Sequence, residues 1–114
     1  GWCLPMIGFS ALGQIIAIGW NGGVMQVTGP VATLGRWTHI AVTYSSSNGL
    51  RLYVNAVFIG QTGAYTFSSS GVPMVATLGQ SLNGQNLCAR GSVMPGNYRG
   101  QIDEFAIYSR ELTS

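Results

Sequence analysis

Acidic side chains, which hydrolases and metal sites both use, are scarce in this chain of 114 residues. No Asp or Glu precedes Asp103, and only Glu104 and Glu111 follow it. Glycosidases use two carboxylates that face one sugar at about 5–10 Å from each other. Asp103 and Glu104 are neighbours in a predicted strand, and neighbouring strand residues point to opposite faces. The sequence therefore argues against glycoside hydrolysis.

The single histidine, His39, offers little for nucleophilic catalysis. No acidic residue lies near it in the sequence, and no G-x-S-x-G motif supplies a serine nucleophile. We expect His39 to be structural and to bond a neighbouring loop group, although a triad assembled in space stays open at this stage. One histidine and two distant cysteines cannot complete a zinc site unless an acid joins them.

Aromatic residues outside the alternating apolar pattern are the remaining candidates for contact with a ligand. Flat rings stack on the apolar faces of sugars or anchor protein partners. Trp20 precedes an Asn-Gly pair, and Tyr98 precedes Arg99. With Tyr65, these residues form the predicted ligand-binding set, and packing in the core is the alternative for each ring. Trp37 is predicted to lie in the core.

Two β-hairpins are the elements that would position these side chains. Alternating apolar residues flank a turn-forming cluster at residues 45–49, which is typical of two antiparallel strands. A second pair of strands, residues 14–20 and 24–28, flanks Asn21-Gly22, the strongest short-range hairpin signal. The alternating residues of the first hairpin are Ile40, Val42, Tyr44, Leu50, Leu52 and Val54.

The rest of the chain is also predicted to be β-structure. Residues 75–79 and 102–108 are expected to form strands, and Tyr65 and Phe67 a short one. Residues 80–99 are rich in glycine and asparagine and are predicted to form a long loop. No segment has a convincing helical period, so we expect an all-β fold of about nine or ten strands.

Two of these stretches resemble the laminin G-like domains of the concanavalin A-like lectin/glucanase class. Residues 37–55 are similar to that family's W-x-H-x-A-x-x-Y…G…L-Y-V-N-G core, and residues 100–112 to its last strand, G-x-I-D-E-x-x-I-Y-x-R-x-L. The resemblance implies an antiparallel two-sheet β-sandwich, a jelly roll, that forms one domain over residues 1–114 and lacks one or more N-terminal strands. Ala56 stands where the family usually has glycine, which leaves the turn type at that position open.

The resemblance also implies a function, namely a non-catalytic recognition module outside the cell or at its surface. Such a module would bind a glycan or an extracellular protein through its rim loops. The alternatives are a structural, self-assembling domain without a small ligand and a relative of the glycoside hydrolases. Family members often bind calcium, but the corresponding loops here contain no acids, so no cofactor is expected. Asp103 matches a metal-binding aspartate of more distant relatives and is the one candidate metal ligand.

Two cysteines, Cys3 and Cys88, can form one disulfide bridge. The extracellular resemblance favours the bridge, and a pair of buried free thiols in a reducing compartment is the alternative.

Charge is sparse and scattered along the chain. Five arginines stand singly, there is no lysine, and the net charge is +2. A clustered basic stripe is absent, which argues against nucleic-acid binding. No run of roughly 18 apolar residues could insert into a membrane. Residues 102–108 are a predicted edge strand with open N–H and C=O groups and few charges to keep another strand away. We expect this edge to be covered by residues 4–9 or by a second copy of the chain in a homo-oligomer.

Overall fold

The computed structural model describes residues 3–67, 71, 76–79 and 89–112. This part of the chain forms strands and no helix, so it contains no helix long and apolar enough to cross a membrane. The strands are β1 (Ile7–Phe9), β2 (Gln14–Trp20), β3 (Val24–Val31), β4 (Ile40–Ser45), β5 (Gly49–Val54) and β6 (Val57–Gln61).

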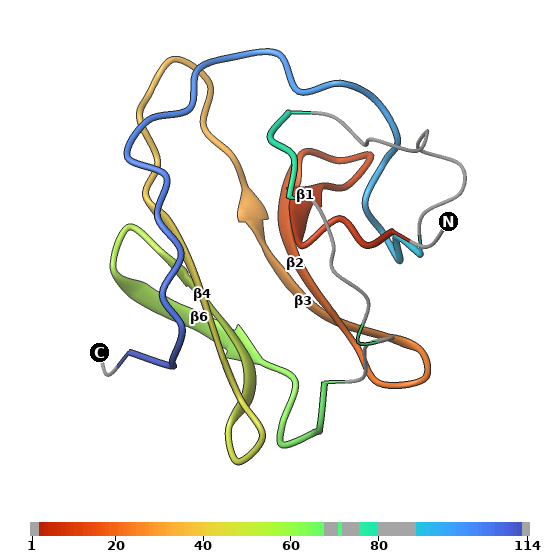
Figure 1. Ribbon diagram of the computed structural model, residues 1–114. Helices are drawn as coiled ribbons and strands as arrows, with labels where there is room; N and C mark the ends of the chain where they lie inside the picture. Colours follow the sequence, from red (N-terminus) through yellow and green to blue (C-terminus); the bar gives the residue numbers. More distant parts are fainter. Residues whose placement is uncertain (1–2, 68–70, 72–75, 80–88, 113–114) are drawn as a thin grey trace.

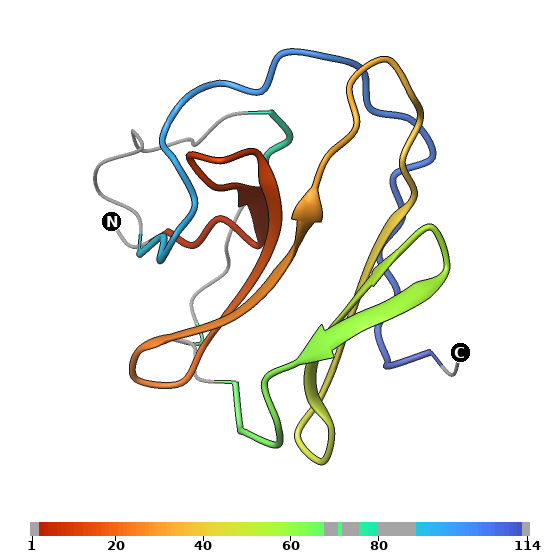
Figure 2. The ribbon, with the colours of Figure 1, turned by 180° about the vertical axis from the view of Figure 1, so that it is seen from behind.

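The six strands form two antiparallel sheets that lie face to face (Figure 1, Figure 2). The first sheet has the order β1-β2-β3 and the second has the order β4-β5-β6. All neighbouring strands are antiparallel. This arrangement confirms the predicted all-β, two-sheet sandwich.

Both predicted hairpins are confirmed. Asn21-Gly22 joins β2 to β3, where Gly22 has a φ of 68° and the N–H of Asn21 donates to the carbonyl of Gly23 at 3.0 Å. The second hairpin pairs Ile40 with Val54 and closes where Ser45 pairs with Gly49. Period-two alternation predicted β4 and β5, and the Asn-Gly pair between two apolar runs predicted β2 and β3. Both signals succeed because each strand pair is local in sequence.

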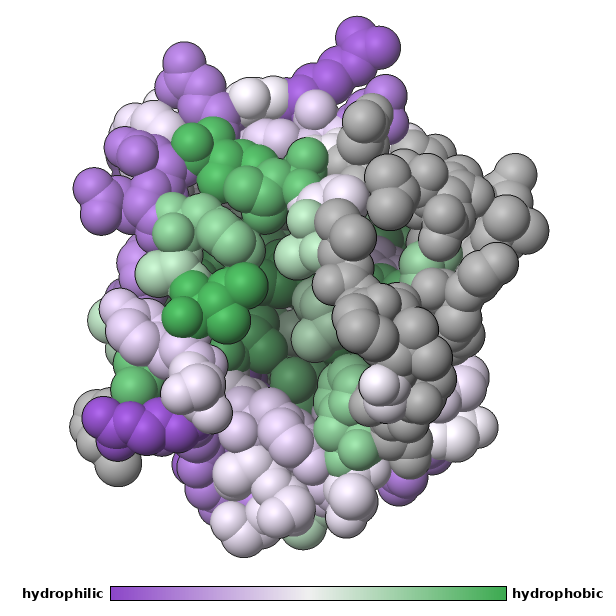
Figure 3. Space-filling model, viewed as in Figure 1, coloured by the Kyte–Doolittle hydropathy of each residue, from purple (hydrophilic) through white to green (hydrophobic). Residues whose placement is uncertain are grey.

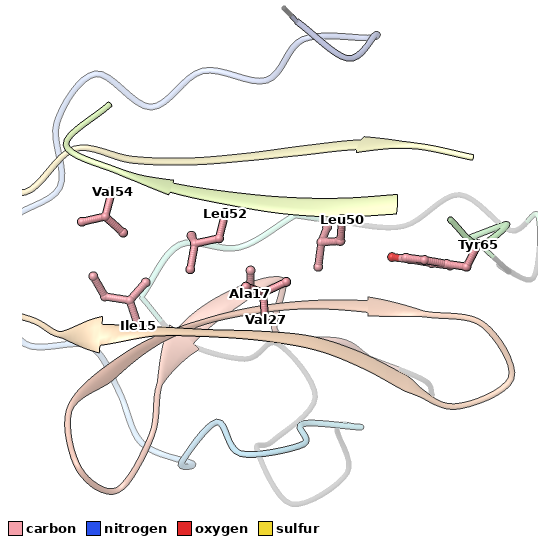
Figure 4. Close-up of a cluster of buried hydrophobic side chains, with 7 residues drawn as sticks. All are labelled: Ile15, Ala17, Val27, Leu50, Leu52, Val54 and Tyr65. Atoms are coloured by element: carbon pink, nitrogen blue, oxygen red, sulfur yellow. The ribbon is translucent and has the colours of Figure 1, made fainter. Parts of the chain in front are cut away.

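The core lies between the two sheets and is built from inward-facing side chains of both (Figure 4). Strand β2 is buried on both faces, because Ile16 and Ile18 point away from this core and pack against Val93. Strands that are buried on both faces typically have continuous apolar sequences, as β2 does. The buried residues between the sheets are Ile15, Ala17, Val27, Leu50, Leu52, Val54 and Tyr65.

The structure answers the question left open at Ala56. Asn55 and Ala56 form the two-residue turn between β5 and β6, with φ angles of 51° and 64°. Positive φ at both central residues is the pattern of a type I′ turn. Asn55 also accepts a hydrogen bond from the His39 N–H through its side chain at 2.9 Å, and its own N–H donates to the His39 carbonyl at 2.8 Å. His39 thus holds the start of β4 through its backbone.

Residues 102–108 do not form the predicted strand. Their side chains are exposed, with Phe105 at 56% and Ile107 at 73%. Glu104 has a φ of 57°, which interrupts an extended backbone, and its N–H donates to Asp103 Oδ1 at 2.8 Å. A strand needs a neighbour that pairs with its N–H and C=O groups. Among the described residues no strand pairs with this segment, and β1, the expected fold-back partner, pairs with β2.

Three further expectations were wrong. Trp37 is 66% exposed and does not lie in the core. Tyr65 and Phe67 lie in irregular backbone and form no strand, and residues 76–79 of the predicted strand 75–79 are likewise irregular. The described residues contain six strands, and the expected nine or ten referred to the whole chain, part of which lies outside them. Aromatic and β-branched composition favours strands, but it does not supply the pairing partner.

Candidate functional site

Tyr65, one of the predicted ligand contacts, is a core residue. It is 7% exposed, and its ring centroid lies 5.2 Å from that of Tyr44 at an interplanar angle of 55°. The Tyr44 hydroxyl donates to the Tyr65 carbonyl and accepts from the Phe67 N–H, both at 2.7 Å. Burial, and then the nearby Tyr44, raise the pKa of Tyr65. The alternative interpretation, core packing, therefore describes this residue.

Trp20 and Tyr98 lie near opposite ends of β2. Trp20 is half-buried at the end of the strand, beside the Asn21 turn. Tyr98 stacks on Phe9 with ring centroids 6.2 Å apart, and Phe9 pairs with Ile15 near the start of β2. The structure therefore does not bring these two rings into one site.

Arg99 follows Tyr98 and is exposed, as is Asp103. The Tyr98 hydroxyl donates to the carbonyl of Gln101 at 3.0 Å, which folds this stretch on itself. No group of three or more potential metal ligands occurs in the described part of the chain. Asp103 as a metal ligand thus stays a prediction, and so does the absence of a cofactor.

The predicted disulfide falls partly outside the described residues, because Cys88 is not among them. The next residue, Ala89, is described, and its N–H donates to the carbonyl of Cys3 at 3.1 Å. The residue that follows Cys88 is therefore held beside Cys3, and the bridge itself stays a prediction.

A surface that the sequence did not single out lies on the outer face of the second sheet. Arg51 and Tyr53 of β5 and Phe58 and Gln61 of β6 line a shallow hollow of about 340 Å³, and we call these four residues the β5–β6 platform. In the sheet, Arg51 pairs with Gln61 and Tyr53 with Phe58. Two aromatic rings thus lie next to a guanidinium group and an amide.

The four side chains of the platform contact one another in two pairs. Arg51 Nε donates to Gln61 Oε1 at 3.0 Å. The rings of Tyr53 and Phe58 lie 5.6 Å apart and are tilted by 59°. Phe58 and Gln61 are exposed, whereas Arg51 and Tyr53 are half-buried. The platform therefore offers flat apolar area and directed polar groups to a ligand, a combination suited to a sugar.

The sequence predicts the outward direction of two of the four platform residues, but not of the other two. Because Leu50, Leu52 and Val54 face the core, Arg51 and Tyr53 must face outward. Phe58 and Gln61 are three positions apart, so simple alternation would place them on opposite faces. The strand pairing shifts between Leu52 and Tyr53, which leaves Ile59 as an extra residue on β6. This β-bulge brings Phe58 and Gln61 to the same face.

Two antiparallel sheets packed face to face are the architecture of a concanavalin A-like β-sandwich. The chain belongs to the laminin G-like family of the concanavalin A-like lectin/glucanases superfamily, whose family model matches residues 5–114. Searches of curated proteins and of solved structures found no match.

Proposed function

We propose that this domain is a non-catalytic recognition module that binds glycans through the β5–β6 platform. The observation that carries the proposal is the pairing of two rings, Tyr53 and Phe58, beside Arg51 and Gln61 on an open sheet face. Aromatic rings cover the apolar face of a sugar, and planar polar groups bind its hydroxyls. Rim-loop residues such as Trp20, Tyr98 and Arg99 would then extend the contact or serve a protein partner.

The position of the acidic residues supports a non-catalytic role. All three acids lie in residues 103–111, and the side chain of Glu111 accepts a hydrogen bond from Asn48 Nδ2 at 2.8 Å. Asp103 and Glu104 are exposed and lie outside the platform. Hydrolysis of a sugar held on the platform would need two facing carboxylates there, and none of the four platform residues has one.

A glycan array tests the proposal with one variant in the platform and one matched control. Tyr53→Ala removes a platform ring, and Val57→Ala removes an exposed apolar side chain of the same hairpin that does not line the hollow. We expect the wild-type chain and Val57→Ala to bind the same glycans, and Tyr53→Ala to bind them about tenfold more weakly. Equal binding by both variants, with unchanged circular dichroism, would move the site away from the platform.

A second candidate function, self-assembly, is favoured by a different observation. Residues 98–112 carry exposed apolar side chains, and apolar residues lie open on the face shown in Figure 3. Single exposed apolar residues are common, but a contiguous group often marks an interaction site. The exposed members are Tyr98, Ile102, Phe105, Ile107, Tyr108 and Leu112.

Light scattering at several concentrations tests self-assembly. A homo-oligomer that forms through residues 98–112 should dissociate in the Phe105→Lys variant, because a charge would then have to be buried at the interface. A particle of 12.0 kDa at every concentration would exclude self-assembly. An oligomer that is unchanged in the variant would place the contact elsewhere.

An extracellular or cell-surface location is part of the same proposal, and the family supports it. The hydrogen bond between Ala89 and Cys3 holds the chain beside Cys88 close to Cys3, which favours a Cys3–Cys88 disulfide. Such a bridge persists in the oxidising environment outside the cell.

A further inference from the structure

Two Asn-Gly pairs stand at hairpin turns of this chain, and the structure surrounds them differently. Asn21-Gly22 lies between β2 and β3, and Asn48-Gly49 lies where β4 meets β5. Asparagine is a labile residue, and a glycine after it has no Cβ atom to hinder the attack of its backbone nitrogen on the asparagine amide. The sequence therefore opens both pairs to spontaneous deamidation, and the fold decides which one reacts.

The turn at Asn21 leaves the side-chain amide free. This turn projects from the end of the first sheet, and both Asn21 and Gly22 are exposed (Figure 1). The N–H of Asn21 donates to the carbonyl of Gly23 at 3.0 Å, so the backbone alone closes the turn. In the described part of the chain, no group forms a hydrogen bond with the Asn21 side chain. The side chain can therefore rotate until its amide carbon meets the nitrogen of Gly22.

The turn at Asn48 holds its amide in place. Asn48 Nδ2 donates to Glu111 Oε1 at 2.8 Å, and the N–H of Asn48 donates to Ser45 Oγ at 3.1 Å. Gly49 begins β5, is buried, and has no room for a Cβ atom beside the carbonyl of Gly63. For the amide carbon to reach the nitrogen of Gly49, the hydrogen bond to the Glu111 carboxylate must break and the packed turn must open. The fold therefore slows the reaction at Asn48.

We propose that Asn21 is a site of spontaneous deamidation in the folded domain and that the fold protects Asn48. Hydroxide removes the proton of the Gly22 N–H, and the nitrogen attacks Cγ of Asn21. The new N–Cγ bond forms as the Cγ–Nδ2 bond breaks, and Nδ2 leaves as ammonia with a proton taken from water. Water then opens the five-membered imide at either carbonyl, which gives aspartate or isoaspartate. No electrons are transferred to or from the protein.

The reaction changes the charge and the backbone at the end of β2 that carries Trp20. A carboxylate replaces a neutral amide, which lowers the net charge of +2 by one unit. Isoaspartate also adds a methylene group to the backbone between Trp20 and Val24, which pair across the hairpin. A longer turn no longer matches the register of β2 and β3. This modification goes beyond the proposed function and is independent of what the domain binds.

Peptide mapping after incubation at mildly alkaline pH tests the proposal. Trypsin cleaves this chain only after arginine, since it has no lysine, and places each Asn-Gly pair in a different peptide. The protein is reduced before digestion so that no disulfide joins two peptides. Mass spectrometry follows the conversion of amide to carboxylate, and chromatography separates aspartate from isoaspartate. The peptides are residues 1–36 with Asn21, residues 37–51 with Asn48 and residues 52–90 with Asn83, whose pair with Gly84 lies outside the described residues.

Two variants and one change of solvent separate the two turns. Glu111→Ala removes the acceptor that holds Asn48 and leaves the turn at Asn21 unchanged. Asn21→Ser removes the reacting amide, and residues 1–36 contain no other asparagine. Urea unfolds the wild-type chain and removes both structural environments, so it measures the rates that the local sequence sets.

We expect Asn21 to deamidate about tenfold faster than Asn48 in the folded protein. This ratio is equivalent to about 1.4 kcal/mol, which is typical of a hydrogen bond to a charged group. In urea the two rates should become similar. Glu111→Ala should raise the rate at Asn48 by about the same factor and leave the rate at Asn21 unchanged. Both rates should rise with pH, because the attack starts from a deprotonated glycine nitrogen.

Several results would contradict these expectations. Equal rates at Asn21 and Asn48 in the folded protein would overturn the proposal, and so would a rate at Asn21 that is far lower in the fold than in urea. An unchanged rate at Asn48 in folded Glu111→Ala would remove Glu111 as the protecting group. If circular dichroism shows that Glu111→Ala does not fold, the rates of the wild-type chain with and without urea still decide the proposal. Conversion within residues 1–36 of Asn21→Ser would assign the reaction to another residue.

Discussion

Replacing Gly49 by alanine should show how tightly the second sheet packs against the chain that follows β6. Gly49 pairs with Ser45 at the hairpin turn and has a φ of 73°. A Cβ atom there would overlap the carbonyl oxygen of Gly63 and lie 2.6 Å from Thr62 Oγ1. Real Cβ atoms do not approach backbone oxygen so closely, so residues 62–63 would have to move away from β5.

The expected cost follows from these contacts. A left-handed conformation costs a non-glycine residue about 1–2 kcal/mol. Moving residues 62–63 away also breaks the hydrogen bonds from Leu50 N–H to Thr62 Oγ1 at 3.1 Å and from Thr62 N–H to the Leu50 carbonyl at 3.0 Å. Each is worth about 1 kcal/mol, and the lower entropy of the unfolded alanine chain offsets roughly 0.5–1 kcal/mol. We expect Gly49→Ala to lower the free energy of unfolding by about 3 kcal/mol.

Gly22 provides the control, because it has a similar φ of 68° but stands in open space. Apart from its chain neighbours, none of the described residues has an atom within 4 Å of the position that a Cβ atom would take there. Gly22→Ala should therefore cost only the conformational penalty, about 1 kcal/mol. Urea unfolding followed by tryptophan fluorescence and circular dichroism measures both variants. Equal costs for the two substitutions would show that Gly49 does not approach Gly63 as described.

Five further outcomes are expected. Ala56→Gly should raise the free energy of unfolding by about 0.5–1 kcal/mol in urea titrations, because Ala56 has a φ of 64°; a loss of stability would contradict the turn. Tyr65→Phe should stabilise the fold by about 1 kcal/mol, since the Tyr65 hydroxyl is buried without a hydrogen-bond partner among the described residues. The pKa of Tyr65 in the folded protein is raised from 10.0, so the fold favours the neutral hydroxyl. The free energy of unfolding should therefore fall as the pH rises above 10.0, and it should fall less in Tyr65→Phe. Thiol titration of unreduced, denatured protein should find no reactive cysteine if Cys3 and Cys88 are bridged, and two would refute the bridge. Calorimetry should detect no calcium binding at micromolar concentrations, and a signal lost in Asp103→Asn would instead establish a site there.

Local pattern was enough to predict the hairpins, because their strands are adjacent in sequence and their pairing depends on nearby residues. Asn21-Gly22 tolerates positive φ, and the apolar residues of β4 and β5 alternate toward one buried face. The sandwich follows from these hairpins, since each has one apolar face that must be buried against the other. The family was recognisable for the same reason, as its core motif lies within one hairpin.

The candidate site could be predicted only in part. The outward direction of Arg51 and Tyr53 follows from the burial of their neighbours in β5. Their partners on β6 depend on the bulge at Ile59, and no residue type at that position signals a bulge. Tyr65 lies outside the alternating apolar pattern, which predicts a ligand contact, but it is buried through distant contacts with Tyr44.

By itself, then, the sequence determined the β class, the two hairpins and the inward faces of their strands. These properties depend on spacing and composition along a short stretch of chain. Only the tertiary structure decided that Phe58 and Gln61 join Arg51 and Tyr53, that Tyr65 lies in the core and that residues 102–108 stay exposed. Each of these depends on which distant segment lies alongside, and the free energy of such contacts comes from pairing and burial rather than from local preference.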